Sequence, residues 1–489
     1  MLNHLKNEAN IAYTENGAVT NASSMSDCLD LFATIGALRA ADEQEIIRRF
    51  VRAYAEDADI AMKILFFGRD VRGGLGERRV FRVIINWLAE NKTESLRKNL
   101  ELIPEFGRYD DLVSLLGTAC EKDALRTVQK LLKADLASDA EVSLLAKWLP
   151  SVNASNAETV RKAKRVARYL GMSDAEYRKT LAELRKKIRI IENNLREKDY
   201  SFDYAKQPSK AMFKYRKAFL RNDGERYNAF LEAVSRGDKQ LHADNLAPYE
   251  IVRSALKANR WGFNARLSAG EKASLNASWE SLPNFCDNRN ALAVVDTSGS
   301  MYCYDNALPA AVAMSLGLYF GERNTGIFHN HFIEFSARPQ LIEIKGKTFA
   351  ERLEYICSFN EVADTNVEAV FNLILDAAVR NHVPREELPE TLYLISDMEF
   401  NSCVRNASLS NFENAKRRFA EHGYKLPQIV FWNVASRNCN QPVTKNEQGV
   451  ALVSGCTPRL FSRVASGDLS PYSVMMEILE SERYAKISA

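Results

Sequence analysis

The hydrophobic pattern of the chain changes once along its length, and this change limits the folds that the chain can adopt. Over residues 25–249, apolar residues recur at spacings of three and four, as at Ile46, Phe50 and Tyr54. This spacing predicts amphipathic helices, and strand-like alternation is nearly absent there. After residue 290, short apolar runs alternate with amphipathic stretches, which predicts strands separated by helices.

The helical stretch is divided by short breaks rich in glycine and proline, which is typical of diverged helical repeats. We therefore expect an α-helical, HEAT-like repeat part followed by a largely parallel, doubly wound α/β sheet. Strands are expected at Ala291–Val295, Phe332–Phe335, Leu392–Ile395 and Ile429–Trp432, and helices at Val367–Val379 and Phe412–Ala420. The expected parts are an N-terminal extension at 1–24, a helical-repeat domain at 25–250, a connection at 251–288 and an α/β domain at 289–489.

The composition and the cysteines indicate a folded protein of the cytoplasm. Hydrophobic residues make up 46 % of the chain and charged residues 26 %, a balance that allows a buried core. The sequence shows no run of about 18 apolar residues and no secretory signal at its N-terminus. The eight cysteines are scattered without metal-ligand or redox spacing. We expect cytoplasmic localisation, reduced thiols and no membrane partner.

A strongly basic segment lies within the expected helical part. Residues 161–226 hold 20 Lys and Arg against 9 Asp and Glu, an excess of +11 in a chain whose net charge is +3. Clustered cations can neutralise nucleic-acid phosphates, and interleaved aromatic residues such as Tyr169 and Tyr215 can stack on unpaired bases. A solvated helix face with core aromatics is the alternative explanation. The candidate RNA contacts are Arg161, Lys162, Arg185, Lys186, Lys187, Lys214, Arg216 and Lys217.

Acidic and hydroxyl residues follow two of the expected strands. The motif Asp296-Thr297-Ser298-Gly299-Ser300 comes directly after the first strand, and Asp397 follows a later one. Thr365 lies between them in a loop that also offers Asp364. One such residue alone is commonly a helix N-cap, but the position of the motif after a strand, together with the two later elements, favours a metal site. Few carboxylates with neutral hydroxyls suit Mg²⁺ or Mn²⁺. The candidate metal ligands are Asp296, Ser298, Ser300, Thr365 and Asp397.

The sequence offers no identifiable catalytic machinery. Gly73, Gly74 and Gly76 follow a helical pattern and lack the Gly-Lys-Ser/Thr ending of a P-loop, so a tight turn between helices is expected. The histidines show no metalloprotease or deaminase arrangement, and Ser298 is not in a Gly-x-Ser-x-Gly elbow. A metal-dependent phosphoesterase is the least favoured class, because the ligands suffice for one metal and no base is evident. We expect a protein that is not an enzyme.

The metal-ligand motif resembles a known pattern. Asp296-Thr297-Ser298-Gly299-Ser300, with Thr365 and Asp397 further along, is similar to the metal-ion-dependent adhesion site of von Willebrand factor A domains, which is Asp-x-Ser-x-Ser, a distant Thr and a distant Asp. The resemblance implies a C-terminal A-like domain. The metal would keep an open coordination position that a carboxylate or phosphate oxygen of a partner could fill.

A second resemblance covers nearly the whole chain. The segments at 66–78, 106–112 and 147–151, and the order of a helical part before an A-like domain, resemble the Ro autoantigen (TROVE) superfamily. Within it, the segments at 208–219 and 396–400 are similar to a domain-of-unknown-function family found in bacteria, plants and large viruses.

In the Ro family, the helical repeats form a ring that the A domain closes, and the ring binds small structured RNAs and single-stranded RNA ends. The resemblance therefore implies a monomeric RNA-binding scaffold. The alternative is a metal-dependent protein-interaction adaptor that binds no nucleic acid and captures an Asp or Glu of its partner.

Overall fold

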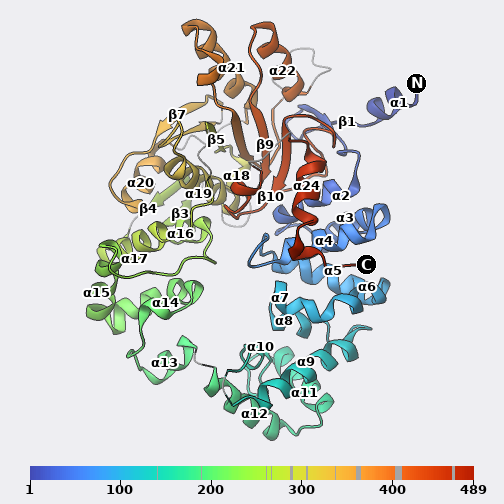
Figure 1. Ribbon diagram of the computed structural model, residues 1–489, viewed down its shortest axis with the longest axis vertical. Coiled ribbons are helices and arrows are strands. Elements are labelled where there is room, and N and C mark those ends of the chain that lie inside the picture. Colours follow the sequence, from blue (N-terminus) through green and yellow to red (C-terminus); the bar gives the residue numbers. More distant parts are fainter. Residues whose placement is uncertain are drawn as a thin grey trace. The chain divides into compact units, whose positions relative to one another are not determined.

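The computed structural model describes residues 1–139, 141–188, 190–259, 262–265, 267–286, 290–303, 307–335, 337–359, 365–401, 410–464 and 469–489 (Figure 1). The chain forms two compact units, each built from separate stretches of sequence. The α/β unit comprises Met1–Asp42, Val51–Glu56 and Tyr204–Ser481. The helical unit comprises Glu43–Phe50, Asp57–Asp203 and Glu482–Ala489.

The helical unit is built from short helices over its described residues. Val80, Phe81, Ile84 and Leu88 show why, because they are buried at helical spacing on one face of a single helix. The elements are α3 (Glu43–Glu56, shared with the α/β unit), α4 (Ala58–Arg69), α5 (Arg78–Asn91), α6 (Thr93–Asn99), η2 (Leu100–Leu102), α7 (Ile103–Phe106), α8 (Tyr109–Val113), α9 (Glu121–Ala137), α10 (Leu145–Trp148), α11 (Ala157–Tyr169), α12 (Asp174–Lys187), α13 (Ile191–Glu197) and η6 (Glu482–Tyr484). The expected helical character is confirmed, and the HEAT-like type of repeat stays a prediction.

The segment between α4 and α5 makes a tight turn that requires glycine at one position. A β-carbon on Gly74 would lie 2.0 Å from the carbonyl oxygen of Phe67, closer than atoms can approach. The N–H of Glu77 donates to the carbonyl of Gly68 (2.7 Å), so the turn folds back onto the end of α4. The glycines at this place therefore form the expected turn between helices.

A fully buried carboxylate organises the arginines beside this turn. Asp111 accepts hydrogen bonds from Nε of Arg69 (2.8 Å), from Nε of Arg82 (2.7 Å) and from the backbone N–H of Arg108 (3.0 Å). Arg69 is itself only 1 % exposed. These guanidinium groups hold the helices together, because a buried cation needs a paired anion.

Asp70 forms a second buried cluster within the same unit. Its carboxylate accepts hydrogen bonds from Nη2 of Arg483 (2.6 Å) and from the hydroxyl of Tyr484 (3.1 Å). The ring of Tyr484 stacks on Phe106 with centroids 5.7 Å apart. The last eight residues of the sequence thus complete the core of the helical unit.

The α/β unit includes a further set of helices and two small hairpins outside its main sheet. These elements are α1 (Leu2–Ala9), β1 (Ile11–Tyr13), β2 (Val19–Asn21), α2 (Asp27–Phe32), η1 (Ile35–Ala37), η3 (Tyr204–Lys206), α14 (Ser209–Asn222), α15 (Gly224–Ser235), α16 (Pro248–Ala255), β3 (Leu256–Asn259), β4 (Gly262–Ala265) and α17 (Ala269–Glu280). The stretch 251–288, expected as a connection, contains β3, β4 and α17, and the extension 1–24 contains β1 and β2. The domain boundaries expected from the sequence stay a prediction.

The main sheet has six strands in the order β10-β9-β8-β5-β6-β7, and all neighbours are parallel except β6 and β7. The strands are β5 (Ala291–Asp296), β6 (His331–Phe335), β7 (Gln340–Glu343), β8 (Thr391–Ser396), β9 (Gln428–Asn433) and β10 (Val450–Ser454). The helices are α18 (Ser300–Cys303), α19 (Leu308–Arg323), α20 (Phe349–Ile356), η4 (Cys357–Phe359), α21 (Val367–Asn381), η5 (Arg385–Glu387), α22 (Asn411–Glu421), α23 (Leu460–Arg463) and α24 (Pro471–Leu479). The four expected strands are confirmed.

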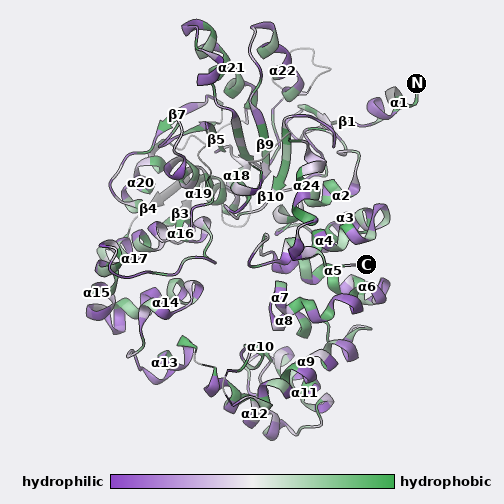
Figure 2. Ribbon diagram, in the orientation of Figure 1, coloured by the Kyte–Doolittle hydropathy of each residue, from purple (hydrophilic) through white to green (hydrophobic). Residues whose placement is uncertain are grey.

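Helices cover both faces of this sheet. Successive side chains of a strand point to opposite faces. Trp432 of β9 contacts Phe461 of α23 (centroids 4.7 Å apart), whereas the preceding Phe431 contacts Phe412 of α22 (6.3 Å). The strands are hydrophobic along most of their length, and Figure 2 shows this in the colour of β9, as expected for strands buried on both faces. The doubly wound arrangement is confirmed.

None of the helices in the described ranges combines the length and the apolar character that crossing a membrane requires.

Candidate metal site

Two carboxylates lie where the strand order of the sheet reverses. From β5 the chain moves to β6 on one side and returns later to β8 on the other side. The loops that leave β5 and β8 therefore run in opposite directions and open a crevice at the carboxyl ends of the strands. Asp296 is the last residue of β5, and Asp397 directly follows β8. These two predicted ligands thus flank the place where α/β sheets bind ligands.

Asp296 is held rigidly by groups at the ends of both strands. Its side chain is fully buried, and its Oδ1 accepts the backbone N–H of Ser298 at 2.8 Å. Its Oδ2 accepts the hydroxyl of Ser396, the last residue of β8. Ser396 is 0 % exposed and was not among the candidate ligands. It positions Asp296 from across the crevice.

The two carboxylates repel one another. Burial, and in addition the negative charge of Asp397, raises the pKa of Asp296 far above the ordinary value of an aspartate. Asp397 is itself buried, with 1 % of its side chain exposed. Nη2 of Arg437 lies 2.9 Å from Asp397 and supplies one positive charge, and the remaining negative charge of the two carboxylates favours a further cation.

The two hydroxyls of the motif lie next to each other beside Asp296. The hydroxyl oxygens of Ser298 and Ser300 are 3.2 Å apart, and Ser300 begins α18. Ser298 is 2 % exposed, whereas Ser300 is half-buried. Thr297, between Asp296 and Ser298, instead donates a hydrogen bond to Glu334 of β6 (2.9 Å). Asp296, Ser298 and Ser300 thus face the candidate site, whereas Thr297 is bound to the neighbouring strand.

Thr365 is buried and precedes α21. Its carbonyl accepts the N–H of Asn401 (2.9 Å), which ties it to the loop that follows Asp397. The structure therefore attaches Thr365 to the site through its backbone. Asp364, the other residue that this loop offered, lies outside the described residues.

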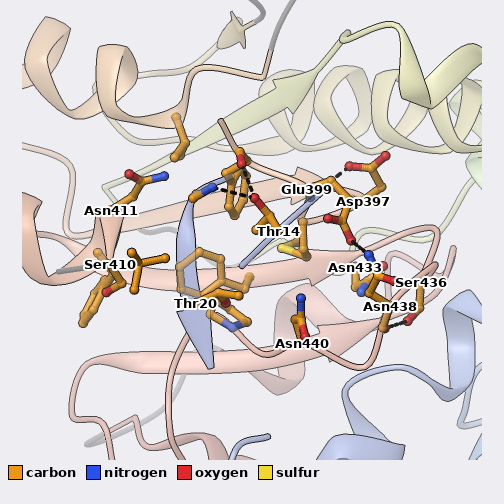
Figure 3. A pocket seen from close by; sticks show the side chains of 18 of the residues that line it. Thr14, Thr20, Asp397, Glu399, Ser410, Asn411, Asn433, Ser436, Asn438 and Asn440 are labelled. Carbon is orange, nitrogen blue, oxygen red and sulfur yellow. Dashed lines mark hydrogen bonds between the residues drawn. The ribbon is translucent and has the colours of Figure 1, made fainter. Parts of the chain in front are cut away.

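The residues after Asp397 were not expected to contribute, and they shape the site. Met398 has a left-handed backbone with φ of 67°, a strained conformation for a residue with a long side chain. Glu399 is buried, and its carboxylate accepts a hydrogen bond from Asn438 (3.0 Å). Burial raises the pKa of Glu399. Figure 3 shows Asp397 and Glu399 together with Asn438 and with Thr14 of the N-terminal hairpin.

This set of donors fits a hard divalent cation. Two carboxylates supply charge and the hydroxyls supply neutral oxygen, which is the ligand chemistry of Mg²⁺ and Mn²⁺. Within the described ranges, no three His, Cys, Asp or Glu side chains are grouped as a metal site. The expected set, with two carboxylates and three hydroxyls, is not a group of that kind.

The candidate RNA contacts are divided between the two units. Arg161 and Lys162 lie on α11 and Arg185, Lys186 and Lys187 on α12, all in the helical unit. Arg185 stabilises the fold, because it donates hydrogen bonds to the carbonyls of Ala146 (2.8 Å) and Leu149 (2.9 Å) and to the Ser151 hydroxyl (2.9 Å). Lys162 pairs with Glu158, and Lys187 donates to the carbonyl of Ser138. Arg161 and Lys186 are exposed.

The other candidates lie on α14 of the α/β unit. Arg216 is buried, lies over the ring of Phe213 (4.1 Å) and donates to the Phe213 carbonyl (2.7 Å). Lys217 pairs with Glu271 at 2.8 Å, and Lys214 lies over the ring of Tyr215 (4.7 Å). Of the three, the two lysines remain exposed to solvent.

The structure also shows that the candidate Arg161 belongs to an arginine stripe whose other members, Arg165 and Arg168, were not among the candidates. Arg161, Arg165 and Arg168 are exposed and lie on one face of α11, at spacings of four and three residues. Arg165 pairs with Glu121 (2.5 Å), and both belong to the helical unit. The helical periodicity of the sequence could have identified this stripe.

The fold and the site define an α/β unit with two buried carboxylates at its strand-order reversal, and a separate helical unit. Residues 14–135 and 123–286 match the family described as a domain of unknown function, DUF2828, and residues 290–467 match DUF7788, also described as a domain of unknown function. The two DUF2828 matches together cover more than half of the chain, so the chain belongs to the DUF2828 family. The chain is also similar to the uncharacterized protein L728 of Acanthamoeba polyphaga mimivirus, with 26 % identity covering 96 % of this chain and 88 % of that protein.

Proposed function

We propose that this chain is a non-enzymatic binding scaffold whose α/β unit, an A-like domain, holds a divalent cation and whose helical unit binds RNA. The observation that carries the cation site is the pair of buried, mutually repelling carboxylates Asp296 and Asp397 at the strand-order reversal. A divalent cation would remove their repulsion, since it is attracted to both.

Each candidate ligand would have a separate task in this site. Asp296 and Asp397 would supply the negative charge, and Ser298, Ser300 and Thr365 would supply neutral oxygens. Mg²⁺ retains exchangeable waters at such a site and therefore offers a position for an oxygen of a partner. Ser396 would act indirectly, because it orients the Asp296 carboxylate.

The cation site can be tested by isothermal titration of the full chain with MnCl₂. We expect one cation per chain, lost in Asp296→Ala. Asp376→Ala is the matched control, because Asp376 lies in the same unit on α21, is 51 % exposed and pairs only weakly with Arg380 (3.4 Å). Binding that persists in Asp296→Ala, or is absent from the wild-type chain, would contradict the proposed site.

The argument for RNA rests on the Ro-like order of the chain and on the arginine stripe of α11. Arg161, Arg165 and Arg168 present three cations over about two turns of α11, and the half-buried Tyr169 is the last residue of that helix. Such a surface holds phosphates with little discrimination between sequences. Arg185 and Arg216 are weaker candidates than the sequence indicated, since their guanidinium groups already serve the fold.

One observation favours a second candidate, an adaptor that captures an acidic group of a protein. The carboxylate of Glu15, on the N-terminal hairpin, lies beside the candidate metal site and shares Arg437 with Asp397. A carboxylate from another segment can therefore approach this region.

Recovery of the tagged protein from its native cells would distinguish the two candidates. RNA and protein from the same sample would be identified by sequencing and by mass spectrometry. We expect a discrete RNA that is lost when the arginine stripe is neutralised and kept in Asp296→Ala. Protein partners without RNA, lost with Asp296→Ala, would instead support the adaptor.

A further inference from the structure

The N-terminal hairpin of β1 and β2 packs against the loop that follows β8. The hydroxyl of Thr14 donates to the carbonyl of Phe400 at 2.6 Å. The backbone N–H of Glu15 donates to the Glu399 carboxylate at 2.7 Å. Both contacts lie within the α/β unit, and the hairpin strand crosses this region in Figure 3. The hairpin turn is therefore fixed to the residues that follow Asp397.

The hairpin leaves little free space on its side of Asp397. A cavity of about 30 Å³ remains between the hairpin, the loop after β8 and α22, and Thr14, Asp397, Glu399 and Asn411 are among its lining residues (Figure 3). This volume suffices for a water molecule but not for a side chain of a partner. This cavity therefore offers a side chain of a partner no room beside Asp397.

One side chain of this chain does contact Asp397. Nη2 of Arg437, in the loop after β9, lies 2.9 Å from Oδ2 of Asp397, and Nη1 of the same guanidinium pairs with Glu15. Asp397 is buried and Glu15 is 45 % exposed, so Arg437 joins an inner and an outer carboxylate. Arg437 is itself only 17 % exposed.

A carboxylate neutralised by a guanidinium attracts a second cation less strongly. Arg437 and a divalent cation would therefore compete for the charge of Asp397. Glu15 offers Arg437 an alternative anion, because it already binds the other end of the guanidinium. Removal of Glu15 would take away one of the two carboxylates that share this guanidinium.

We propose, on the basis of the cation site proposed above, that Arg437 competes with the divalent cation for the Asp397 carboxylate. When the cation binds Asp397, Arg437 retains its ion pair with Glu15. The N-terminal hairpin thereby sets the affinity of the metal site. The occupancy of the site and the ion pair of the hairpin become coupled, and each favours the other.

The proposal predicts opposite effects for two substitutions. Arg437→Gln removes the competitor and tightens cation binding by about five- to tenfold, the range of a partly buried ion pair. Glu15→Gln returns Arg437 to Asp397 and weakens cation binding by about two- to threefold, because an exposed pair is worth less. The backbone contact of residue 15 is kept in Glu15→Gln. A loop that merely lost its packing would weaken cation binding in both variants.

The chain contains a matched control cluster in the same unit. Arg352 is also 17 % exposed and also joins a buried carboxylate, Glu322 (3.2 Å), to an exposed one, Glu280 (2.9 Å). We expect no change in cation affinity for Arg352→Gln or Glu280→Gln. Arg437→Lys keeps the positive charge and is expected to stay within about twofold of wild type.

The experiment is isothermal titration of MnCl₂ into the full-length variants, after thermal melting has shown that each is folded. Tighter binding in Arg437→Gln with weaker binding in Glu15→Gln establishes the coupling. Weaker binding in both, or no change in Arg437→Gln, overturns it while the Asp296-dependent cation site stands. If neither the wild type nor Arg437→Gln binds the cation, the proposed cation site fails and this inference fails with it.

Discussion

The arginine stripe of α11 allows a quantitative test of RNA binding by the helical unit. The perturbation is the triple substitution of Arg161, Arg165 and Arg168 by Gln, which lowers the net charge from +3 to 0. Each arginine that neutralises a phosphate of single-stranded RNA adds about −0.7 to the slope of log K against log salt concentration. Three lost contacts should therefore make the slope about 2 units less steep.

This change of slope gives a large difference in affinity. Between 50 and 200 mM salt, the wild-type chain should lose about 20-fold more affinity than the triple variant, by the same phosphate-release relation. The assay is fluorescence anisotropy of a labelled single-stranded RNA at four or more salt concentrations. Because the three side chains are exposed, the variant should melt at the wild-type temperature.

A control triple removes the same charge from two other helices of the helical unit, α6 and α9. Arg97, Arg126 and Lys130 are 43 %, 72 % and 67 % exposed and are all ion-paired with acidic side chains. Their substitution by Gln should leave the slope near that of the wild type. The reasoning is refuted if the stripe variant keeps the wild-type slope, or if the control variant loses as much, since net charge alone would then explain the binding.

Three further predictions concern the fold. Asp111→Asn leaves the buried guanidinium of Arg69 without its counter-charge and should lower the free energy of unfolding by about 3–5 kcal/mol in urea denaturation, and a loss below about 1 kcal/mol would contradict the buried pairing. Gly74→Ala should cost about 1–3 kcal/mol by overpacking, whereas Gly224→Ala, where a β-carbon meets nothing within 4 Å, should leave the melting temperature nearly unchanged. Lys217→Gln should raise the pKa of Glu271 from about 2 towards its ordinary value in an NMR titration, because Lys217 supplies its largest stabilising hydrogen bond. Since the folded-state pKa of Glu271 is lowered, its contribution to stability is present above about pH 4.5 and is lost as the pH falls towards 2, and the variant should show less of that loss.

The central strands, and the position of Asp296 at the end of one of them, could be predicted because their signals are local. Val294 and Val295 belong to an uninterrupted buried run, and Asp296 follows it directly, so the sequence alone indicates both the strand and its end. The edge strand β7 was missed because Leu341 and Ile342 are its only apolar residues, and β10 because no helix separates it from β9. A short edge strand such as β7 carries a weak hydrophobic pattern, since most of its side chains are exposed.

The contacts around the site could not be predicted, because they join residues that are distant in sequence. Arg437 lies 40 residues beyond Asp397, and Glu15 lies 422 residues before Arg437. Nothing in the local pattern of 11–21 indicates that this hairpin pairs with the loops after β8 and β9, since its anchoring bonds use polar side chains and backbone groups. Likewise, the sequence does not show that Arg185 binds backbone carbonyls of its own fold, because those partners lie more than 30 residues away.

The cluster around Asp70 has a consequence for how the protein matures during synthesis. Asp70 is fully buried, and Arg483, which neutralises it, is 413 residues further along the chain. At about 5–20 residues per second, a ribosome needs about 20 to 80 s to produce the arginine after the aspartate. During this interval the turn between α4 and α5 carries a carboxylate without its guanidinium partner, so α4 to α8 can form but cannot close their core. The core of the helical unit can therefore be completed only after Arg483 has been translated.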